Sequence, residues 1–211
     1  MRRKSVPREY FESLVIAVVL ALFVRTWVFQ AFKIPTGSME PNLLVGDHLI
    51  VNKLVFAPQA TAFDRAILPM RPIRRGDVVV FKYPKAPERD FVKRVIGLPG
   101  DRVELRRKVV HINGEPLEEP HAYLTEPASA DGPPRRDDLR EEYGPVTVPP
   151  DQYFMMGDNR DNSEDSRYWG FMPASYVKGK ALFVYYSFED SGSLASIVTA
   201  TRWDRLFRPV R

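Results

Sequence analysis

The stretch "KIPTGSMEPNLLVGD", Lys33 to Asp47, places Ser38 between a glycine and a methionine directly after an apolar segment. A serine hydroxyl is a weak nucleophile until a neighbouring base takes its proton. The chain has three histidines, His48, His111 and His121, and their spacing gives no support to a Ser-His-Asp triad. His48 stands in a strand-like run, so a position near Ser38 and a position facing solvent both stay open for it.

A neutral lysine can serve as the base instead, and Lys93 is the candidate. In "DFVKRVIG", the side chains of Phe91, Lys93 and Val95 would share one face of a strand. An amine between apolar neighbours loses hydration, which favours its neutral form. Lys53, in "IVNKLVF", has similar neighbours, so apolar flanking alone does not distinguish the two lysines.

The acidic loop "GDNRDNSEDSRYWG" raises the question of a calcium site. Aligned from Asp161, the sixth position is Ser166, where an EF-hand loop needs glycine, and the twelfth is Met172, where it needs glutamate. The pattern therefore excludes an EF-hand. Asp165 and Arg167 stand two residues apart, and such a pair can brace a tight turn. A solvated surface loop is the alternative interpretation.

The element before Ser38 is an apolar N-terminal segment. Basic residues precede it: Arg2, Arg3, Lys4 and Arg8. A helix from Tyr10 to Phe32 would be roughly 34 Å long, about one bilayer hydrocarbon core. Bulky residues, Trp27, Phe29 and Phe32, stand where a cleavable signal needs small ones, so we expect an uncleaved transmembrane anchor. The basic tail predicts a cytoplasmic N-terminus, with everything after Phe32 outside the cytoplasmic membrane.

The sequence after the anchor predicts a mainly β structure. Three Gly-Asp pairs open strand-like runs, "GDHLIVNKLVF", "GDVVVFKYP" and "GDRVEL", in which glycine permits a tight turn and aspartate caps it. Further strands are predicted in "DFVKRVIGL", "KVVHINGEPL", "DQYFMMGD" and "GKALFVYYSF", with a hairpin turn at Asn113-Gly114. No alternation of strands with helices appears, so we expect an antiparallel sheet.

The domain boundaries follow from these elements. We assign residues 1–32 to the cytoplasmic tail and anchor, residues 33–100 and 151–211 to a catalytic β domain, and residues 101–150 to an inserted smaller β/loop lobe. Within it, the polar, proline-rich stretch Thr125–Glu142 is expected to be a surface loop, and Ala57–Arg75 a second excursion.

The C-terminal "RWDRLFRPVR" places Trp203, Leu206 and Phe207 at helical spacing, with arginines between them. We favour a short helix or strand end that caps the core, and a basic contact with a membrane surface is the alternative.

Composition narrows the function classes. The 211 residues are 44% hydrophobic and 27% charged, which is compatible with a packed core. There is no cysteine, which excludes disulfides, thiolate chemistry and cysteine-ligated metal. The net charge of +4 forms no basic stripe interleaved with aromatic residues, so nucleic acid is not an expected partner.

Taken together, the motifs resemble those of bacterial type I signal peptidases, or leader peptidases. The stretch "IPTGSMEPNLLVGD" after an anchor is similar to that family's nucleophile box, and "RGDVVVFKYP" with "FVKRVIGLPGD" to its lysine box. "GDNRDNSEDSRYWGFMP" is similar to its third signature. The resemblance covers most of the chain, and the order of the motifs makes it specific.

The resemblance implies roles for individual residues. Ser38 would be the nucleophile and Lys93 its general base, while the Thr36 hydroxyl would help the Ser38 backbone N–H to bind the oxyanion. Three residues would support them: Ser163, by orienting the lysine amine, and Asp165 with Arg167, as an ion pair. The substrate pockets would be lined by Ile34, Leu43, Val80, Phe91 and Val92. Asn42 departs from the family, where threonine is more usual, and we expect this change to be inconsequential.

The resemblance also implies the activity. We expect a membrane-bound serine endopeptidase with a Ser-Lys dyad that cleaves signal peptides from exported preproteins after small residues, in an Ala-x-Ala pattern, without metal or organic cofactor. The substrate would add as a strand beside Asp90–Val92. The enzyme would cross the bacterial cytoplasmic membrane once, with its catalytic domain on the outer or periplasmic side. Preproteins from the export machinery and the lipid bilayer would be its partners.

Two other classes stay open. A relative of the Ser-Lys autoproteolytic repressors would carry a DNA-binding helix-turn-helix in place of the anchor. A non-enzymatic anchored β-domain that binds extended peptides would have no need for Ser38, Lys93 and Ser163 together.

Overall fold

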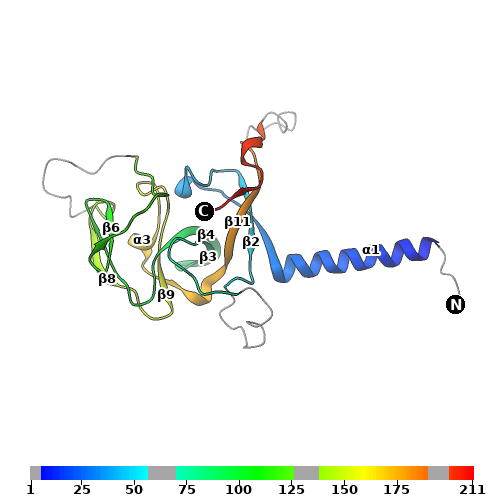
Figure 1. The fold of residues 1–211 in the computed structure, drawn as a ribbon, viewed down its shortest axis with the longest axis horizontal. Coiled ribbons are helices and arrows are strands. Elements are labelled where there is room, and N and C mark those ends of the chain that lie inside the picture. Colours follow the sequence, from blue (N-terminus) through cyan, green and yellow to red (C-terminus); the bar gives the residue numbers. More distant parts are fainter. Residues whose placement is uncertain (1–5, 57–69, 126–137, 190–199) are drawn as a thin grey trace.

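The computed structural model describes residues 6–56, 70–125, 138–189 and 200–211. Helix α1 (Val6–Phe23) continues as a π-helical turn, Val24–Val28, and projects away from the β body (Figure 1). In the described ranges this is the one helix, Val6–Val28, that is long and apolar enough to cross a membrane. The basic residues 2–4, on which the expected orientation depends in part, lie outside the described residues.

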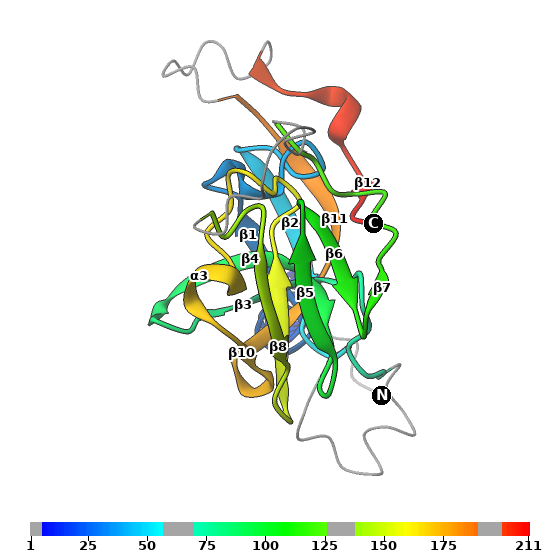
Figure 2. The ribbon, with the colours of Figure 1, turned by 90° about the vertical axis from the view of Figure 1, so that its left-hand side faces the viewer.

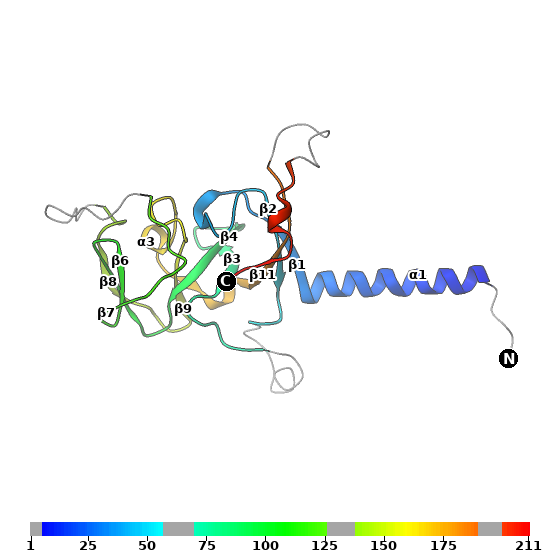
Figure 3. The same ribbon diagram turned by 45° about the horizontal axis from the view of Figure 1, so that its top comes forward.

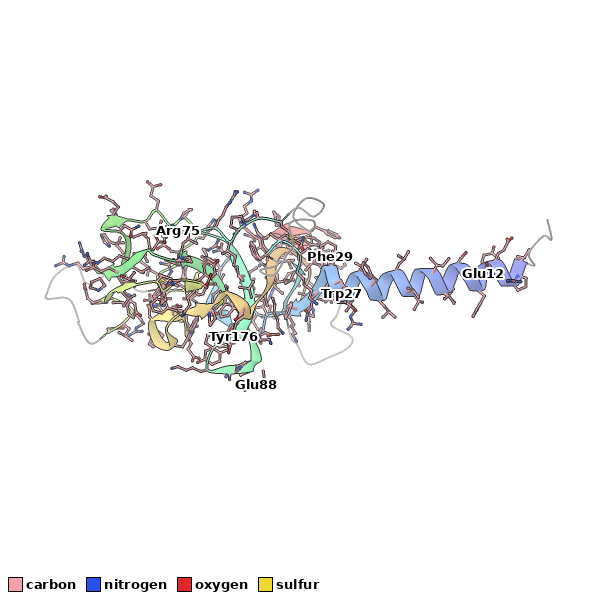
Figure 4. All side chains as sticks on the ribbon, turned by 90° about the horizontal axis from the view of Figure 1, so that it is seen from below. Glu12, Trp27, Phe29, Arg75, Glu88 and Tyr176 are labelled. Atoms are coloured by element: carbon pink, nitrogen blue, oxygen red, sulfur yellow. The ribbon has the colours of Figure 1, made fainter. Side chains whose placement is uncertain are left out.

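The helix ends earlier than the sequence suggested. We expected it to reach Phe32, but Phe29–Lys33 forms strand β1, which pairs antiparallel with β2 (Asp47–Asn52). The apolar residues of "FQAFK" suit a strand as well as a helix, and pairing with β2 supplies backbone partners that an isolated helix end lacks. Trp27 and Phe29 lie where the helix meets the β body (Figure 4).

The main sheet is antiparallel, with strand order β1-β2-β11-β3-β4-β9-β10 and β12 beside β11. Its other strands are β3 (Val78–Tyr83), β4 (Ala86–Gly97), β9 (Gln152–Met156), β10 (Met172–Pro173), β11 (Val177–Ser187) and β12 (Arg208–Pro209). The short helical segments are η2 (Gly37–Met39), α3 (Ser166–Trp169), η3 (Ala174–Tyr176) and η5 (Trp203–Arg205).

A second sheet has the order β7-β6-β5-β8. Its strands are β5 (Arg102–Arg106), β6 (Val109–Ile112), β7 (Glu115–Pro116) and β8 (Tyr143–Thr147). This small sheet faces the viewer in Figure 2, and the helix leaves the opposite end of the molecule (Figure 3). The prediction of a mainly β fold with one N-terminal helix of membrane-spanning length is confirmed.

The predicted turns form. Gly46, Gly76 and Gly100 have φ values of 90°, 88° and 87°, which glycine adopts without strain. Each following aspartate accepts the backbone N–H three residues before it, at 2.8 Å for Asp47, 2.9 Å for Asp77 and 2.7 Å for Asp101. The Asn113-Gly114 turn between β6 and β7 also has two positive φ values, 56° and 95°. These turns fix where their strands begin.

The core forms on both faces of the main sheet. Side chains of β3 and β4 alternate between two clusters. One cluster contains Ile34, Met39, Leu43, Val78 and Val80, with Val92 packed against it. The other contains Val79, Phe81, Val95, Met155 and Trp169, with Phe91 packed against it. A third cluster joins the two sheets through Ile96, Val103, Leu105, Val110 and Phe154. Lys93 lies on β4 at the same face as Phe91 and Val95.

Two predictions lie largely outside the described residues, because the excursions at 57–75 and 125–142 include residues 57–69 and 126–137. The C-terminal segment forms the short helix and strand end that we expected. The core-capping role is wrong for its aromatic rings, since Trp203 and Phe207 are 63% and 73% exposed. The buried residue is Arg205, whose guanidinium pairs with Asp47 at 2.5 Å and stabilises the turn before β2.

Candidate active site

Ser38 lies in the 3-10 turn η2 that follows β1. The turn is anchored on both sides: Ile34 is buried and its N–H donates to the Asp47 carbonyl at 2.8 Å, and Met39 is 1% exposed in the core. Lys93 reaches this turn from the middle of β4, and its Nζ donates to Ser38 Oγ at 2.5 Å. The structure therefore brings together the two residues that the sequence selected as nucleophile and base.

The amine of Lys93 is almost fully removed from water. The residue is 3% exposed, and its Nζ lies 5.6 Å from the centre of the Phe91 ring. Burial lowers the pKa of Lys93 to about 8, because desolvation disfavours the charged amine. The negative charge of Asp165 opposes this shift and the positive charge of Arg167 adds to it. A substantial neutral fraction is therefore available at mildly alkaline pH.

A cleft of about 330 Å³ opens beside these two residues. One wall is the chain from Phe32 to Met39, the other is Arg89–Lys93 of β4, and Asn162 and Glu164 also line it. In the described part of the chain β9 pairs with β4 only from Arg94 to Gly97, so β4 has an unpaired edge along Arg89–Val92. An extended peptide placed in the cleft would find backbone donors and acceptors there.

The predicted pocket residues divide into two groups. Ile34, Phe91 and Val92 line the cleft. Leu43 and Val80 do not: they are 2% and 0% exposed and pack in the core cluster that also holds Ile34. Their prediction as lining residues of this cleft is corrected: both side chains are buried in the core cluster to which Ile34 belongs and against which Val92 packs.

Thr36 and Ser163 both lie near the pair, with different surroundings. Thr36 is exposed on the cleft wall, two residues before Ser38. Ser163 is buried, but its Oγ has no hydrogen-bond partner among the described residues, so the expected hydrogen bond with the Lys93 amine is not formed. It packs instead against Gly157, where a Cβ would meet this oxygen at 2.3 Å.

The pair Asp165–Arg167 is buried. Its oxygen and nitrogen atoms are 2.8 Å apart, and neither side chain is exposed. Arg167 also donates to the Arg160 carbonyl at 2.7 Å, and Asp165 accepts the Gly157 N–H at 3.2 Å. The alternative of a solvated surface loop is therefore wrong for these two residues, because both are buried. Their hydrogen bonds to Gly157 and Arg160 connect the end of the segment 157–167 to its beginning.

Sequence reasoning missed the residues that hold the serine turn. The Asn159 N–H donates to the Ser38 carbonyl at 3.1 Å, and its side-chain amide donates to the Gly37 carbonyl at 3.3 Å. The preceding residue, Asp158, forms a buried two-point ion pair with Arg94, at 2.6 and 2.7 Å. A fourth Gly-Asp pair at 157–158 was a visible signal, but its partners lie far away in the sequence.

Asn42, the position at which threonine is more usual in the family, uses its side-chain amide in two hydrogen bonds. Its amide donates to Asp158 Oδ2 and to the His121 carbonyl, both at 2.9 Å. A residue of the serine loop is thereby bonded to two other segments.

The histidines take no part in this cleft. The His48 ring lies among Tyr185, Tyr186 and Phe188, with ring-centre distances of 5.9, 5.7 and 6.2 Å, and it is not among the cleft-lining residues. Burial lowers the pKa of His48. In the described residues, no three His, Asp or Glu side chains cluster as metal ligands would.

Comparison with known proteins gives the family. The family described as "Signal peptidase, peptidase S26" matches residues 7–186 of this chain. The chain belongs to the signal peptidase family S26. Signal peptidase I of Pseudomonas aeruginosa is 37% identical over 208 residues, covering 86% of this chain and 73% of that protein. Signal peptidase I S of Bacillus subtilis is 38% identical over 191 residues, covering 90% and 94%.

Signal peptidase I of Aquifex aeolicus is 34% identical, covering 85% of this chain and 84% of that protein. A solved signal peptidase I of Enterococcus faecalis aligns with 52% of this chain and 97% of its own, at 34% identity and a TM-score of 0.41. The recognition from sequence motifs is confirmed. As a family member the chain is a serine endopeptidase, and its substrates are preproteins that carry signal peptides.

Proposed function

We propose that this signal peptidase works through a Ser38–Lys93 dyad. The observation that carries the proposal is the 2.5 Å approach of Lys93 Nζ to Ser38 Oγ, made by an amine that is 3% exposed. Its pKa of about 8 supports a role as a base. Serine needs a proton acceptor in contact with its hydroxyl, and no histidine lines this cleft.

The chemistry follows from the positions of these groups. Neutral Lys93 takes the proton of Ser38 as Oγ attacks the scissile carbonyl. The oxyanion that forms is bound by the Ser38 N–H and the Thr36 hydroxyl. The lysine ammonium then gives its proton to the leaving amine, and an acyl-enzyme remains on Ser38. Lys93, neutral again, activates the water that hydrolyses this ester.

The cleft favours small residues next to the cut. An extended substrate strand lying against Arg89–Val92 presents its side chains alternately to the two faces. The residues one and three before the cut then point to the same wall, which Ile34 and Val92 form above the buried Leu43 and Val80. Little depth is available over this packed layer, which supports an Ala-x-Ala specificity.

The molecule would act at a bilayer surface. We place Val6–Val28 across the bacterial cytoplasmic membrane, with the N-terminus in the cytoplasm and the β body on the outer or periplasmic side. The main sheet, from β1 onward, then forms the catalytic domain, and the small sheet with its loops forms an inserted lobe within residues 101–150. Preproteins leaving the export machinery and the lipids are its partners. No metal, organic cofactor or nucleic acid enters the proposal.

One comparison tests the proposal. Purified wild type and Ser38→Ala are given a preprotein in detergent, with Ser175→Ala, an exposed serine outside the cleft, as control. We expect cleavage by wild type and the control and none by Ser38→Ala, with equal melting temperatures, because only the attacking oxygen is lost. Substantial turnover by pure Ser38→Ala would exclude the dyad. A serine-reactive acylating probe that attaches to wild type and Ser175→Ala but not to Ser38→Ala would exclude a peptide-binding domain without catalysis.

A further inference from the structure

The small sheet is connected to the serine turn by a segment that we name the strap, residues 117–123. It leaves β7, where the Leu117 N–H donates to the Val110 carbonyl at 2.8 Å. At its other end it runs beside Asn159. The Tyr123 N–H donates to the Asp158 carbonyl at 2.7 Å, and the Tyr123 carbonyl accepts the Arg160 N–H at 3.0 Å. The strap thus lies against the residues that contact Ser38.

One side-chain contact of the strap is the ion pair Glu119–Arg160. Arg160 meets both carboxylate oxygens of Glu119, at 2.6 and 2.5 Å, and the two side chains are 4% and 12% exposed. Arg160 Nε also donates to the Gly157 carbonyl at 3.1 Å. Two-point pairing of a buried guanidinium fixes direction as well as distance. Glu119 therefore sets the position of Arg160 and, through it, of Gly157.

The other contact involves Asn42, on the serine loop itself. Its amide joins the strap at the His121 carbonyl to Asp158, as described above. Asn42 follows Ser38 by four residues, and the next N–H, of Leu43, donates to the Met39 carbonyl at 2.9 Å. The C-terminal half of the serine turn is therefore bonded to the strap.

Between these two contacts lies the segment that touches the nucleophile. A Cβ on Gly157 would lie 2.4 Å from the Ser38 carbonyl oxygen, so the two backbones are in close contact. The Asn159 N–H bonds that same carbonyl. A displacement of residues 157–159 is therefore passed on to Ser38. Lys93 is placed by β4, whose next residue, Arg94, is paired with Asp158, so the same segment contacts both the nucleophile and the strand that carries the base.

We infer that Glu119 and Asn42 are positioning residues, through which the strap holds Ser38 in register with Lys93. Neither residue lines the cleft. Their effect is geometric, and small errors in the placement of a nucleophile are costly in rate. This inference rests on the proposed Ser38–Lys93 dyad, and it gives the small sheet and its connections a part in catalysis.

The test uses the full-length chain in detergent with a short peptide substrate. Glu119→Gln keeps the shape of the side chain and removes its charge, and Asn42→Ala removes both amide bonds. Glu118→Gln is the matched control, since Glu118 is the neighbouring carboxylate and is exposed. Active sites are counted with a serine-directed acylating probe, so that kcat refers to folded enzyme alone. We expect kcat to fall about 10- to 100-fold in both variants, with KM changed by less than about 2-fold.

A purely structural strap would give a different result. Loss of fold would reduce the number of titrated sites and leave kcat per site unchanged, whereas misplacement of Ser38 lowers kcat per site. If Glu119→Gln fails to fold because Arg160 is left unpaired, Asn42→Ala and the milder Asn42→Thr, which keeps one donor, decide the question. Asn42→Thr should fall between wild type and Asn42→Ala.

Two outcomes separate this inference from the proposed function. Ser38→Ala and Lys93→Met are assayed on the same peptide. Turnover by Ser38→Ala would remove the dyad, whatever the strap variants do. If Ser38→Ala is inactive while Glu119→Gln and Asn42→Ala match Glu118→Gln in kcat, the dyad stands and the strap has no role in positioning the nucleophile.

Discussion

At the scale of single residues, the low pKa of Lys93 comes from burial rather than from a cationic neighbour. Burial is the largest cause, and the positive charge of Arg167 acts in the same direction. The carboxylates of Asp165, Glu164 and Asp158 oppose it. The net value, about 8, therefore depends on keeping water from the amine, and a bound substrate strand over the cleft would exclude more water.

The pH dependence of cleavage follows from this value. The pKa of Lys93 is lowered from its ordinary value of 10.5 to about 8, so the fraction of neutral amine increases as pH rises through about 8. We expect kcat/KM for a short peptide to rise along its acid limb with a midpoint near this value. Lys93→Arg should be inactive, because guanidinium keeps its proton throughout this range.

Lys53→Met is the matched control for that experiment. Lys53 was the rival candidate, but its Nζ donates to the Thr26 carbonyl at 2.7 Å and it is not among the cleft-lining residues. It should retain wild-type turnover and the same pH midpoint. Near-wild-type activity in Lys93→Arg would show that Lys93 is not the base.

The sequence predicted the close approach of Ser38 and Lys93 better than it predicted the surroundings of the pair. Ser38 and Lys93 stand in recognisable motifs, and the period of a strand places Lys93 between Phe91 and Val95. The roles of Asn42 and Ser163 depend on residues distant in the chain, such as the His121 carbonyl for Asn42. Local sequence carries no signal for such partners, because hydrogen bonds between loops depend on the finished fold.

At the scale of elements, the segment 157–167 acts as a brace under the active site. The Asp165–Arg167 pair lies inside it with both side chains unexposed. Removing one partner of a buried ion pair leaves the other charge unpaired in the protein interior, where water cannot solvate it. The brace also holds Gly157, through Asp165, against the serine turn.

We expect Arg167→Ala to cost about 3–5 kcal/mol of unfolding free energy, because Asp165 loses its partner. Activity should fall as well, since Gly157 is no longer held in place. Thermal or denaturant unfolding measures the change. Arg106→Ala is the control, because Arg106 is 52% exposed in its pair with Glu104 and should leave the melting temperature unchanged. A similarly small effect for Arg167→Ala would mean that the pair is dispensable.

The boundaries of helices and strands are less predictable from local sequence patterns than the elements themselves. Strands and turns were predictable, because alternating apolar residues and the Gly-Asp pairs act locally. The end of the helix was not, since Phe29–Phe32 is apolar apart from Gln30 and follows the helix without a break in the pattern. The choice between helix and strand there depends on β2, which follows later in the chain and offers a pairing edge.

At the scale of the whole molecule, the helix and the nucleophile are joined by a rigid connection. Nine residues lie between Val28 and Ser38, which are ten steps apart along the chain, and β1 takes up five of the nine within the main sheet. At about 3.3 Å per residue, Ser38 lies at most about 33 Å along the chain from the helix end. In the proposed membrane arrangement this keeps the cleft close to the bilayer surface, where a signal peptide emerges.

The position of β1 determines how the anchor can be removed. Deleting residues 1–25 should leave the β body intact, because the Thr26 and Val28 carbonyls that bond Lys53 and all of β1 remain. Deleting residues 1–32 removes most of β1 and one cleft-lining residue, Phe32, and exposes the edge of β2.

Both truncated chains should process membrane-inserted preprotein poorly, since tethering no longer concentrates enzyme and substrate at one surface. Only the shorter deletion should keep the melting temperature of the β body and the cleavage of a short peptide. The comparison requires peptide turnover, preprotein processing in vesicles and thermal unfolding for both truncated chains and the full-length protein. Equal stability and peptide turnover in the two truncations would show that β1 is not needed to hold the serine turn. The chain that lacks residues 1–25 keeps all of the proposed catalytic groups. If it processes preprotein as well as the full-length protein does, the helix contributes no tethering.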